Sequence, residues 1–392
     1  MRWESAKIID CIDKIQFCKP SQDFGNGNFC YIDISSVDNK IKMITSVQTI
    51  RGLDAPSRAK QMVQEGDVIV STVRPNLNAV AYIEKHHHGA VASTGFCVLR
   101  SDKDKIHPRY LYFWVRSNMF ISNMVKQATG ASYPAVSDTV IKQSLISLPP
   151  LYEQERIAEI LDKADSLRQK DKSLLQKYHQ LAQCIFYDMF GDPVKNEKGW
   201  EVKKLLECVE GKYGIKAGPF GSSLKKEFYV SSGYKIYGQE QVIADDFSIG
   251  DYYISDPKYK ELESCKVTPG DVLISMVGTY GKVSVVPENV IPGIINPRLV
   301  KISFDKTKIN PLYFKFCFQL PETKYLLSTY SRGGTMDIIN AGILKTLDIL
   351  SPPISMQNIF VKKLERISDS KNLISTNTSK MLFDALMSKY FE

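Results

Sequence analysis

The sequence predicts an α+β protein: two globular α/β domains joined by two long, antiparallel, coiled-coil-like helices, arranged as a tandem repeat with pseudo-two-fold symmetry. Three observations indicate this architecture. A stretch of roughly forty residues without glycine or proline has helical periodicity. The second half of the chain repeats the motifs of the first half in the same order. Each half also mixes short strand-like runs with short helical ones.

The long helix is predicted between Pro149-Pro150, which force an extended lead-in, and Gly191-Asp192-Pro193, which end it. At 1.5 Å per residue it would extend about 60 Å, too far to lie within one small domain, so we expect it to connect domains. Charged residues fill its other faces. The apolar positions recur at steps of three and four: Ile157, Ile160, Leu161, Ala164, Leu167, Leu174, Tyr178, Leu181, Ala182, Ile185 and Met189.

The repeat is carried by ordered matches at a nearly constant spacing of about 200 residues, far longer than the period of a solenoid. The matched pairs are Trp3-Glu4 with Trp200-Glu201, residues 65–71 with 269–275, 106–113 with 309–316, 129–132 with 332–335, 147–151 with 350–354, and Gln154 with Gln357. A second helix, residues 355–391, repeats the first with a poorer apolar seam. The predicted segments are a first domain at 1–150, the central helix at 151–192, a second domain at 193–353 and a C-terminal helix at 354–392.

Within the first domain, alternating and apolar runs predict strands, and Pro108 in a first turn predicts a helix running toward Val125. The expected strands are 29–34, 67–73, 79–83 and 90–92. A small-residue loop at 128–134 is expected before the chain enters the long helix.

Composition is that of an ordinary soluble protein of 392 residues, with 43% hydrophobic and 24% charged residues. No apolar run approaches a membrane span and no apolar signal core begins the chain, so we expect a cytoplasmic protein with no membrane partner. The eight cysteines are scattered singly, and His86-His87-His88 is expected to be a solvated turn, so no metal is predicted. The net charge of +8 has the sign that suits a phosphate-bearing partner.

The run from Pro149-Pro150-Leu151 through Glu153-Gln154 to Asp162, followed by a long helix, resembles the central conserved region of type I restriction-modification specificity subunits. The echo at Pro352-Pro353-Ile354 with Gln357 fits the same family. The resemblance spans the whole chain. It implies a non-catalytic reader of double-stranded DNA without cofactors, whose two target-recognition domains each contact one half of an asymmetric bipartite target. It also implies that the helices set the spacer and dock two methyltransferase subunits, with motor-nuclease restriction subunits joining for cleavage.

Base edges are read by amide, hydroxyl and guanidinium groups on loops held by a rigid scaffold, with Lys and Arg nearby for phosphates. Loops of this kind, together with the resemblance, nominate DNA-contacting residues in both domains. In the first domain they are Arg58, Lys60, Arg74, Asn76, Asn78, Thr129, Ser132 and Tyr133. In the second they are Lys216, Ser222, Ser223, Lys225, Gln239, Gln241, Thr279, Tyr280, Lys282, Arg332 and Thr335.

Equivalent loops differ between the domains, with Arg74-Pro75-Asn76 facing Gly278-Thr279-Tyr280 in the repeat. Two different half-sites and a non-palindromic target are therefore expected. The half-sites should lie about one helical turn apart, because both domains must approach the same face of the duplex.

Catalytic motifs are not found. The two Pro-Pro pairs lack the Asn or Asp before them and the aromatic residue after them that an adenine methyltransferase needs. No G-x-G-x-x-G or G-x-x-x-x-G-K-[ST] run is present, and Phe220-Gly221-Ser222-Ser223 is not a G-x-S-x-G elbow. Asp245-Asp246 is expected to be a pair of surface carboxylates. The sequence predicts no chemistry of its own.

Two other functions remain open at this point. A scaffold of the same shape could bind RNA or only proteins, and it would lack sequence-specific retention on duplex DNA with a methyltransferase partner present. An enzyme with an unrecognised site would transfer methyl groups as the purified chain alone.

Overall fold

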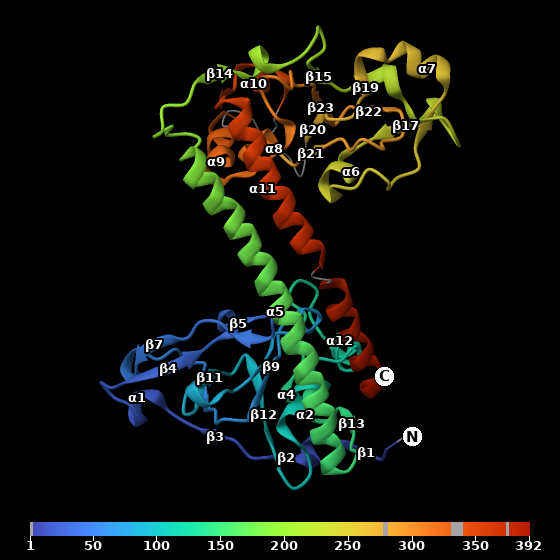
Figure 1. Ribbon diagram of the computed structural model, residues 1–392. Helices are drawn as coiled ribbons and strands as arrows, with labels where there is room; N and C mark the ends of the chain where they lie inside the picture. Colours follow the sequence, from blue (N-terminus) through green and yellow to red (C-terminus); the bar gives the residue numbers. More distant parts are fainter. Residues whose placement is uncertain (1–2, 277–280, 331–339, 374–375) are drawn as a thin grey trace. The chain divides into compact units, whose positions relative to one another are not determined.

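The computed structural model describes residues 3–276, 281–330, 340–373 and 376–392 (Figure 1). The chain divides into two compact units, each with its own core. Unit 1 comprises Met1–Leu175 with Ile374–Glu392, and unit 2 comprises Gln176–Leu373. The helix α5, Leu151–Phe190, is continuous and contributes residues to both units.

Unit 1 is built on two main sheets, ordered β10-β9-β12-β2 and β3-β8-β11-β4-β7. Its strands are β1 Ser5–Lys7, β2 Ile12–Asp13, β3 Gln16–Phe17, β4 Asn28–Ile32, β5 Val37–Asp38, β6 Met43–Ile44, β7 Gln48–Arg51, β8 Ala59–Met62, β9 Val68–Ser71, β10 Val80–Tyr82, β11 Val91–Ser93, β12 Phe96–Ser101 and β13 Leu145–Ser147. Its short helices are α1 Pro20–Asp23, α2 Pro108–Trp114, α3 Asn118–Gln127 and α4 Asp138–Lys142.

Unit 2 has two main sheets in the orders β15-β23-β20-β21 and β16-β18-β17-β22-β19. Its strands are β14 Val202–Lys204, β15 Ile215–Ala217, β16 Tyr229–Val230, β17 Tyr234–Tyr237, β18 Tyr253–Ile254, β19 Lys266–Val267, β20 Val272–Ser275, β21 Val283–Val285, β22 Gly293–Ile295, β23 Leu299–Ile302 and β24 Asp348–Leu350. Its helices are α6 Gln239–Ala244, α7 Asp256–Glu261, α8 Pro311–Gln319, α9 Pro321–Tyr330, α10 Ala341–Thr346 and α11 Ile354–Leu373.

The two units repeat one topology. In unit 1, β11 pairs parallel with β4 and antiparallel with β8, and in unit 2 β22 pairs parallel with β17 and antiparallel with β19. The registers match too, because Phe96 faces Ser71 in the first unit and Leu299 faces Ser275 in the second. The prediction of two repeated domains that mix helix and strand is confirmed.

The Pro-Pro-x-x-x-Gln motif joins each domain to its helix by the same three hydrogen bonds. The amide of Gln154 donates to the carbonyls of Lys105 (3.1 Å) and Pro149 (2.8 Å) and accepts from the His107 N–H (2.9 Å). Gln357 makes the equivalent bonds to the carbonyls of Lys308 and Pro352 and to the N–H of Asn310, at 2.9, 2.8 and 2.9 Å. Both glutamines are buried, so each amide group satisfies backbone groups that water cannot reach.

Two helical segments cover the first domain helix in each unit. In unit 1, Ile157 and Leu161 of α5 and Phe383 and Met387 of α12 (Thr376–Phe391) join the core around α2. In unit 2, Phe186 and Phe190 of α5 and Phe360 of α11 join a cluster with Tyr313 of α8. The C-terminal helix α12 thus occupies the place in unit 1 that the end of α5 occupies in unit 2.

One predicted helix in unit 1 differs from the structure. The helix expected from Pro108 toward Val125 is split into α2 and α3, because the Ser117 side chain accepts from the Phe120 N–H and caps a new helix. The C-terminal helix expected over 355–391 is described as α11 and α12, and residues 374–375 between them lie outside the described residues. The end of α5 agrees with the sequence, since Gly191 (φ 74°) donates to the Tyr187 carbonyl after the last helical residue.

Candidate nucleic-acid interface

Two of the predicted loops of unit 1 meet at Arg74 and Tyr133. The Arg74 N–H donates to the Pro134 carbonyl at 2.7 Å, and Val73 bridges to Ala135. The Arg74 guanidinium carbon lies 4.9 Å from the centroid of the Tyr133 ring. Tyr133 is 70% exposed, so the stacked pair faces solvent. This contact holds an arginine fork in a defined orientation before any ligand arrives.

The loop that carries Arg74 has a sparsely populated backbone conformation. Arg74 (φ 49°) and Asn78 (φ 47°) are both left-handed and flank the short turn Pro75–Leu77. Each non-glycine residue of this kind costs on the order of 1 kcal/mol and persists only where the surroundings impose it. Asn76, between them, is exposed.

The second predicted loop of unit 1 is a tight, exposed turn. Thr129 and Ala135 exchange both backbone hydrogen bonds at 2.9 Å, which closes the loop. Gly130 (φ 98°) lies so close to the Tyr133 carbonyl oxygen that a Cβ would be 2.8 Å from it, so no other residue fits there without strain. Ser132 is exposed on this turn.

Arg58 belongs to the same row of backbone segments. The Thr94 N–H donates to the Arg58 carbonyl at 2.8 Å, and the Thr72 N–H donates to the Gly95 carbonyl at 2.9 Å. Segments 58–60, 93–95, 72–76 and 129–135 therefore lie next to one another, and we call them the unit 1 loop row. Thr94 is exposed on the unit 1 loop row. Sequence reasoning missed it, because a short turn between two strands carries no local pattern that indicates DNA contact. Lys60 is also exposed.

Charge distinguishes the arginines of this row from the others in unit 1. Six arginines pair with carboxylates within the unit: Arg51, Arg100, Arg109, Arg116, Arg156 and Arg168. Among residues 3–175, Arg58 and Arg74 form no such ion pair and are exposed. Their charges are therefore available to an anionic partner.

Asn78 does not fit the predicted role. Its side chain is buried, and its Nδ2 donates to the Val115 carbonyl at 2.9 Å. It cannot reach a base edge in this position. We correct its assignment from base contact to anchoring of the 74–78 loop on the end of α2.

Lys42 also anchors the 74–78 loop. Its ammonium donates to the carbonyls of Leu77 (3.2 Å) and Asn78, and its own carbonyl accepts from the Tyr112 hydroxyl at 2.9 Å. Burial, and then the charges of Arg116 and Arg168, lower the pKa of Lys42 to about 8. The lysine thus ties the loop row to α2 at a cost in charge burial.

This pKa predicts a pH-dependent stability. Between pH 8 and the ordinary lysine value of 10.5, the unfolded chain holds more protons at position 42 than the folded chain. The free energy of unfolding of the wild type should therefore rise relative to Lys42→Met as the pH increases through this window. Urea denaturation at several pH values measures the difference. Lys40→Met, an exposed neighbour, should show no such trend, and a flat difference for Lys42→Met would contradict the buried charge.

In unit 2, predicted loops converge on Asn296. A Cβ on Gly218 would lie 1.9 Å from the Asn296 carbonyl oxygen, and one on Gly238 would lie 2.7 Å from its Nδ2. The Asn296 N–H donates to the Tyr237 carbonyl at 2.8 Å. Loops 216–225 and 238–239 are thus packed against the turn 296–298, which sequence reasoning missed, and we call these three segments the unit 2 loop row.

The predicted residues of unit 2 fall into three groups. Lys216 lies 5.6 Å from the Tyr213 ring centroid and is half-buried, while Ser222, Lys225 and Lys282 are exposed. Ser223 and Gln239 are partly exposed on the same loop row. Thr279, Tyr280, Arg332 and Thr335 lie outside the described residues.

Gln241 was assigned wrongly as a DNA contact. Its side chain is fully buried; it accepts from the Gly238 N–H at 2.7 Å and donates to the Ile249 carbonyl at 2.9 Å. It closes the first turn of α6 and holds the 249–250 segment. Its role is to position the Gly238 loop.

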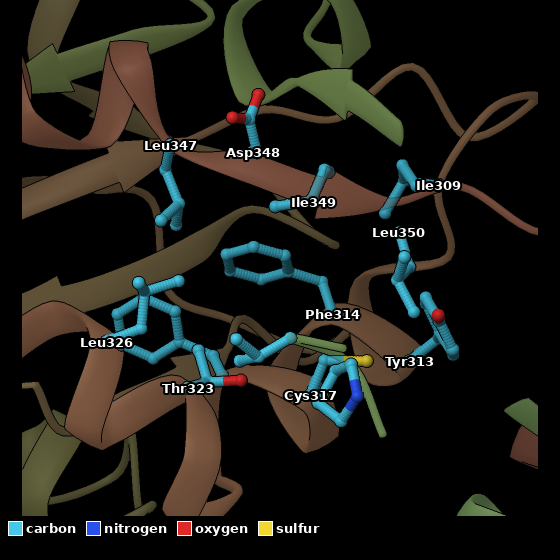
Figure 2. A pocket seen from close by; sticks show the side chains of 13 residues that line it. Ile309, Tyr313, Phe314, Cys317, Thr323, Leu326, Leu347, Asp348, Ile349 and Leu350 are labelled. Carbon is cyan, nitrogen blue, oxygen red and sulfur yellow. The ribbon is translucent and has the colours of Figure 1, made fainter. Parts of the chain in front are cut away.

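A candidate metal site is not found in the described part of the chain. No group of three or more His, Cys, Asp or Glu side chains there could hold a metal ion. Figure 2 shows an apolar gap in unit 2 where Phe314 of α8 and Ile349 of β24 face one another. Its volume of about 40 Å³ is far below the roughly 300–1000 Å³ of ligand pockets, so we interpret it as a packing gap.

None of the helices within the described ranges is long and apolar enough to cross a membrane.

The architecture is that of a duplicated recognition protein, in which one mixed fold presents a row of loops in each copy. Residues 3–177 and 197–382 both match the family model of the type I restriction modification DNA specificity domain. The chain belongs to this family.

Individual relatives agree with the family assignment. The MjaVIII type I restriction enzyme specificity subunit of Methanocaldococcus jannaschii is 24% identical over 396 residues, covering 94% of this chain and 86% of that protein. The EcoBI specificity subunit of Escherichia coli is 22% identical over 303 residues, covering 71% of this chain and 62% of that protein.

Solved structures share the fold. The S subunit of a type I restriction-modification system from M. genitalium matches with a TM-score of 0.59 at 14% identity, covering 100% of this chain and 96% of that one. A chain from a study of complex assembly and conformational transition in the type I R-M system matches with a TM-score of 0.53 at 24% identity, covering 100% and 98%.

Proposed function

We propose that this chain is the DNA sequence-specificity subunit of a type I restriction-modification enzyme, with each unit reading one half of an asymmetric bipartite target. The observation that carries the proposal is the unit 1 loop row. Four neighbouring backbone segments carry the exposed residues Arg58, Arg74, Thr94 and Tyr133, and both arginines lie outside the ion pairs of the described residues. Such a set suits phosphates and base edges in one groove.

The target is asymmetric because the two loop rows differ. The unit 1 loop row presents a guanidinium stacked on a tyrosine, whereas the unit 2 loop row presents Lys216, Ser222 and the 296–298 turn. The same scaffold with different loop residues should select different bases. The residues proposed to contact DNA are Arg58, Lys60, Arg74, Asn76, Thr129, Ser132 and Tyr133 in unit 1, and Lys216, Ser222, Ser223, Lys225, Gln239, Thr279, Tyr280, Lys282, Arg332 and Thr335 in unit 2.

The helices form the spacer of the proposed reader. The repeated packing of two helical segments on α2 and on α8 supports an antiparallel, pseudo-two-fold pair of the kind expected from the apolar seam. The length of the pair would set the gap between half-sites. Leu167, Leu174 and Leu181, which were expected in this seam, are exposed on α5, and we propose that two methyltransferase subunits dock on the helices there.

Chemistry is supplied by the partners in this proposal, and the chain acts in the cytoplasm. Methyltransferase subunits would modify the target, and motor-nuclease restriction subunits would cleave unmodified DNA. The chain itself would contribute affinity through phosphate contacts and selectivity through its loops, without a cofactor.

The proposal is tested by co-expressing the chain with its methyltransferase subunit and mapping modified adenines across a genome. We expect one motif of two unlike short half-sites separated by an unread gap. A palindromic motif would contradict the asymmetry, and modification without a bipartite motif would contradict the reader itself. Sequence-specific retention on duplex DNA, with the methyltransferase present, separates this function from an RNA-binding or protein-binding scaffold.

A further inference from the structure

The turn between β22 and β23 carries an exposed arginine, Arg298. Its N–H donates to the Asn296 side-chain oxygen at 2.9 Å, and its carbonyl accepts from the Met276 N–H at 3.0 Å. The first bond closes the turn on itself, and the second ties it to the residue that follows β20. The guanidinium projects from a rigid backbone, which suits a residue that must meet a base edge in one geometry.

The surroundings place Arg298 on the proposed DNA-reading surface. Gly218 and Gly238, from two loops that the sequence nominated for DNA contact, both pack on Asn296, two residues before Arg298. The Gly218 N–H donates to the carbonyl of Leu299, the residue that follows Arg298, at 2.9 Å. Arg298 is thus flanked by the predicted loops although it belongs to neither.

Charge sets Arg298 apart from the rest of its domain. Between residues 193 and 353 the sequence has two arginines, and the other, Arg332, lies outside the described residues. Within the described residues, Arg298 takes part in no ion pair, as is also true of Arg58 and Arg74 in unit 1. Arginines in unit 1 away from the loop row are neutralised by carboxylates.

The strand registers relate Arg298 to unit 1. Because Leu299 faces Ser275 and Phe96 faces Ser71, Arg298 corresponds to Gly95. A Cβ on Gly95 would lie 3.0 Å from the Ile34 side chain, so this turn of unit 1 has little space for a side chain. Unit 1 instead carries its arginines on the two segments bonded to that turn, at Arg58 and after Thr72 at Arg74.

We propose that Arg298 is a specificity-determining residue of unit 2 that reads a guanine of its half-site through the O6 and N7 acceptors of the major groove. Guanine is the base whose two acceptors match a guanidinium fork, and this is the commonest specific arginine contact. The two units would then share a scaffold but place the reading arginine on neighbouring turns. This inference rests on the proposed function.

The test uses the chain co-expressed with its methyltransferase subunit, with modified adenines mapped for the wild type, Arg298→Ala, Arg298→Lys and Lys306→Ala. Lys306 is an exposed positive charge beyond the opposite end of β23 and serves as the matched control. We expect Arg298→Ala to lose about 10- to 100-fold discrimination at one guanine of one half-site, with the other half-site unchanged. Arg298→Lys keeps the charge but not the fork, and should lose the same discrimination while retaining affinity for non-specific duplex DNA.

Each outcome decides one point. An unchanged motif with Arg298→Ala overturns the inference and leaves the proposed function standing. Equal loss at every site with Arg298→Ala, restored by Arg298→Lys, makes Arg298 a phosphate contact and also overturns it. If Arg298→Ala does not fold, Arg298→Lys alone decides. A wild type without a bipartite motif overturns the proposed function, and the inference falls with it.

Discussion

Replacing Phe186 by alanine is expected to lower the free energy of unfolding of unit 2 by about 3–5 kcal/mol. Phe186 is completely buried, and its ring centroid lies 5.5 Å from those of Phe316 and Phe360 and 6.0 Å from that of Tyr313. Truncation would open a cavity where α5, α8 and α11 meet. Hydrogen exchange should show lost protection in α8 and α11, with the core strands β9 and β12 of unit 1 remaining protected.

The control for this prediction lies on the same helix. Leu181 is 46% exposed, so Leu181→Ala should change the free energy of unfolding by well under the amount expected for a buried aromatic residue. Equal effects of the two substitutions would show that the aromatic cluster does not hold the end of α5 in unit 2. Loss of protection throughout both units would show that the units do not unfold separately.

Local sequence signals predicted the elements whose boundaries depend on local chemistry. Pro149-Pro150 and Gly191 mark the two ends of α5. Proline has no N–H to donate to a preceding helical turn, and glycine readily adopts the left-handed conformation that ends a helix. The repeat predicted the two domains. The predicted antiparallel helix pair implied that the C-terminal helix returns to the first domain. It did not identify Phe383 and Met387 as the residues that enter the unit 1 core, because that contact joins residues more than two hundred positions apart.

The candidate site shows the same division. Composition and the repeat placed loops correctly as exposed polar segments, as at Ser132 and Tyr133. Composition and the repeat failed for Asn78 and Gln241, whose side-chain amides donate hydrogen bonds to the carbonyls of Val115 and Ile249. An amide side chain reads the same in sequence whether it faces a base or a buried carbonyl, so only its tertiary neighbours separate the two roles.

The joint between domain and helix differs between the units in its charge. In unit 1, the guanidinium of Arg116, just after the end of α2, lies 3.1 Å from the carboxylate of Asp165 on α5. Both side chains are almost fully buried, at 4% and 5% exposure. The repeat offset of 203, from Gln154 to Gln357, assigns Gln319 and Ser368 to these positions in unit 2. The burial of Asp165 would raise its pKa, but Arg116 and Arg168 outweigh burial and lower it from 3.8.

Asp165→Ser is therefore expected to destabilise unit 1 by about 3–5 kcal/mol, because it leaves the Arg116 charge buried without its partner. The stability that Asp165 supplies is present above its ordinary pKa of 3.8 and is lost as the pH falls through its lower folded value, so the deficit of the variant should shrink in acid. Denaturant unfolding at neutral and acid pH measures it. Glu153→Gln, which removes a pair with the half-exposed Arg156 on the same helix, should cost far less than Asp165→Ser.

The double variant Arg116→Gln with Asp165→Ser separates a buried-charge penalty from a packing defect. It replaces both residues by those at the equivalent positions of unit 2 and so removes both charges together. Because neither charge is then buried without its partner, the double variant should recover part of the stability that Asp165→Ser loses. Equal destabilisation of the single and double variants would show instead that the Arg116 side chain, stacked on Phe383 at 5.2 Å, stabilises α12 through packing. Either result assigns the joint between α2, α5 and α12 to one physical cause.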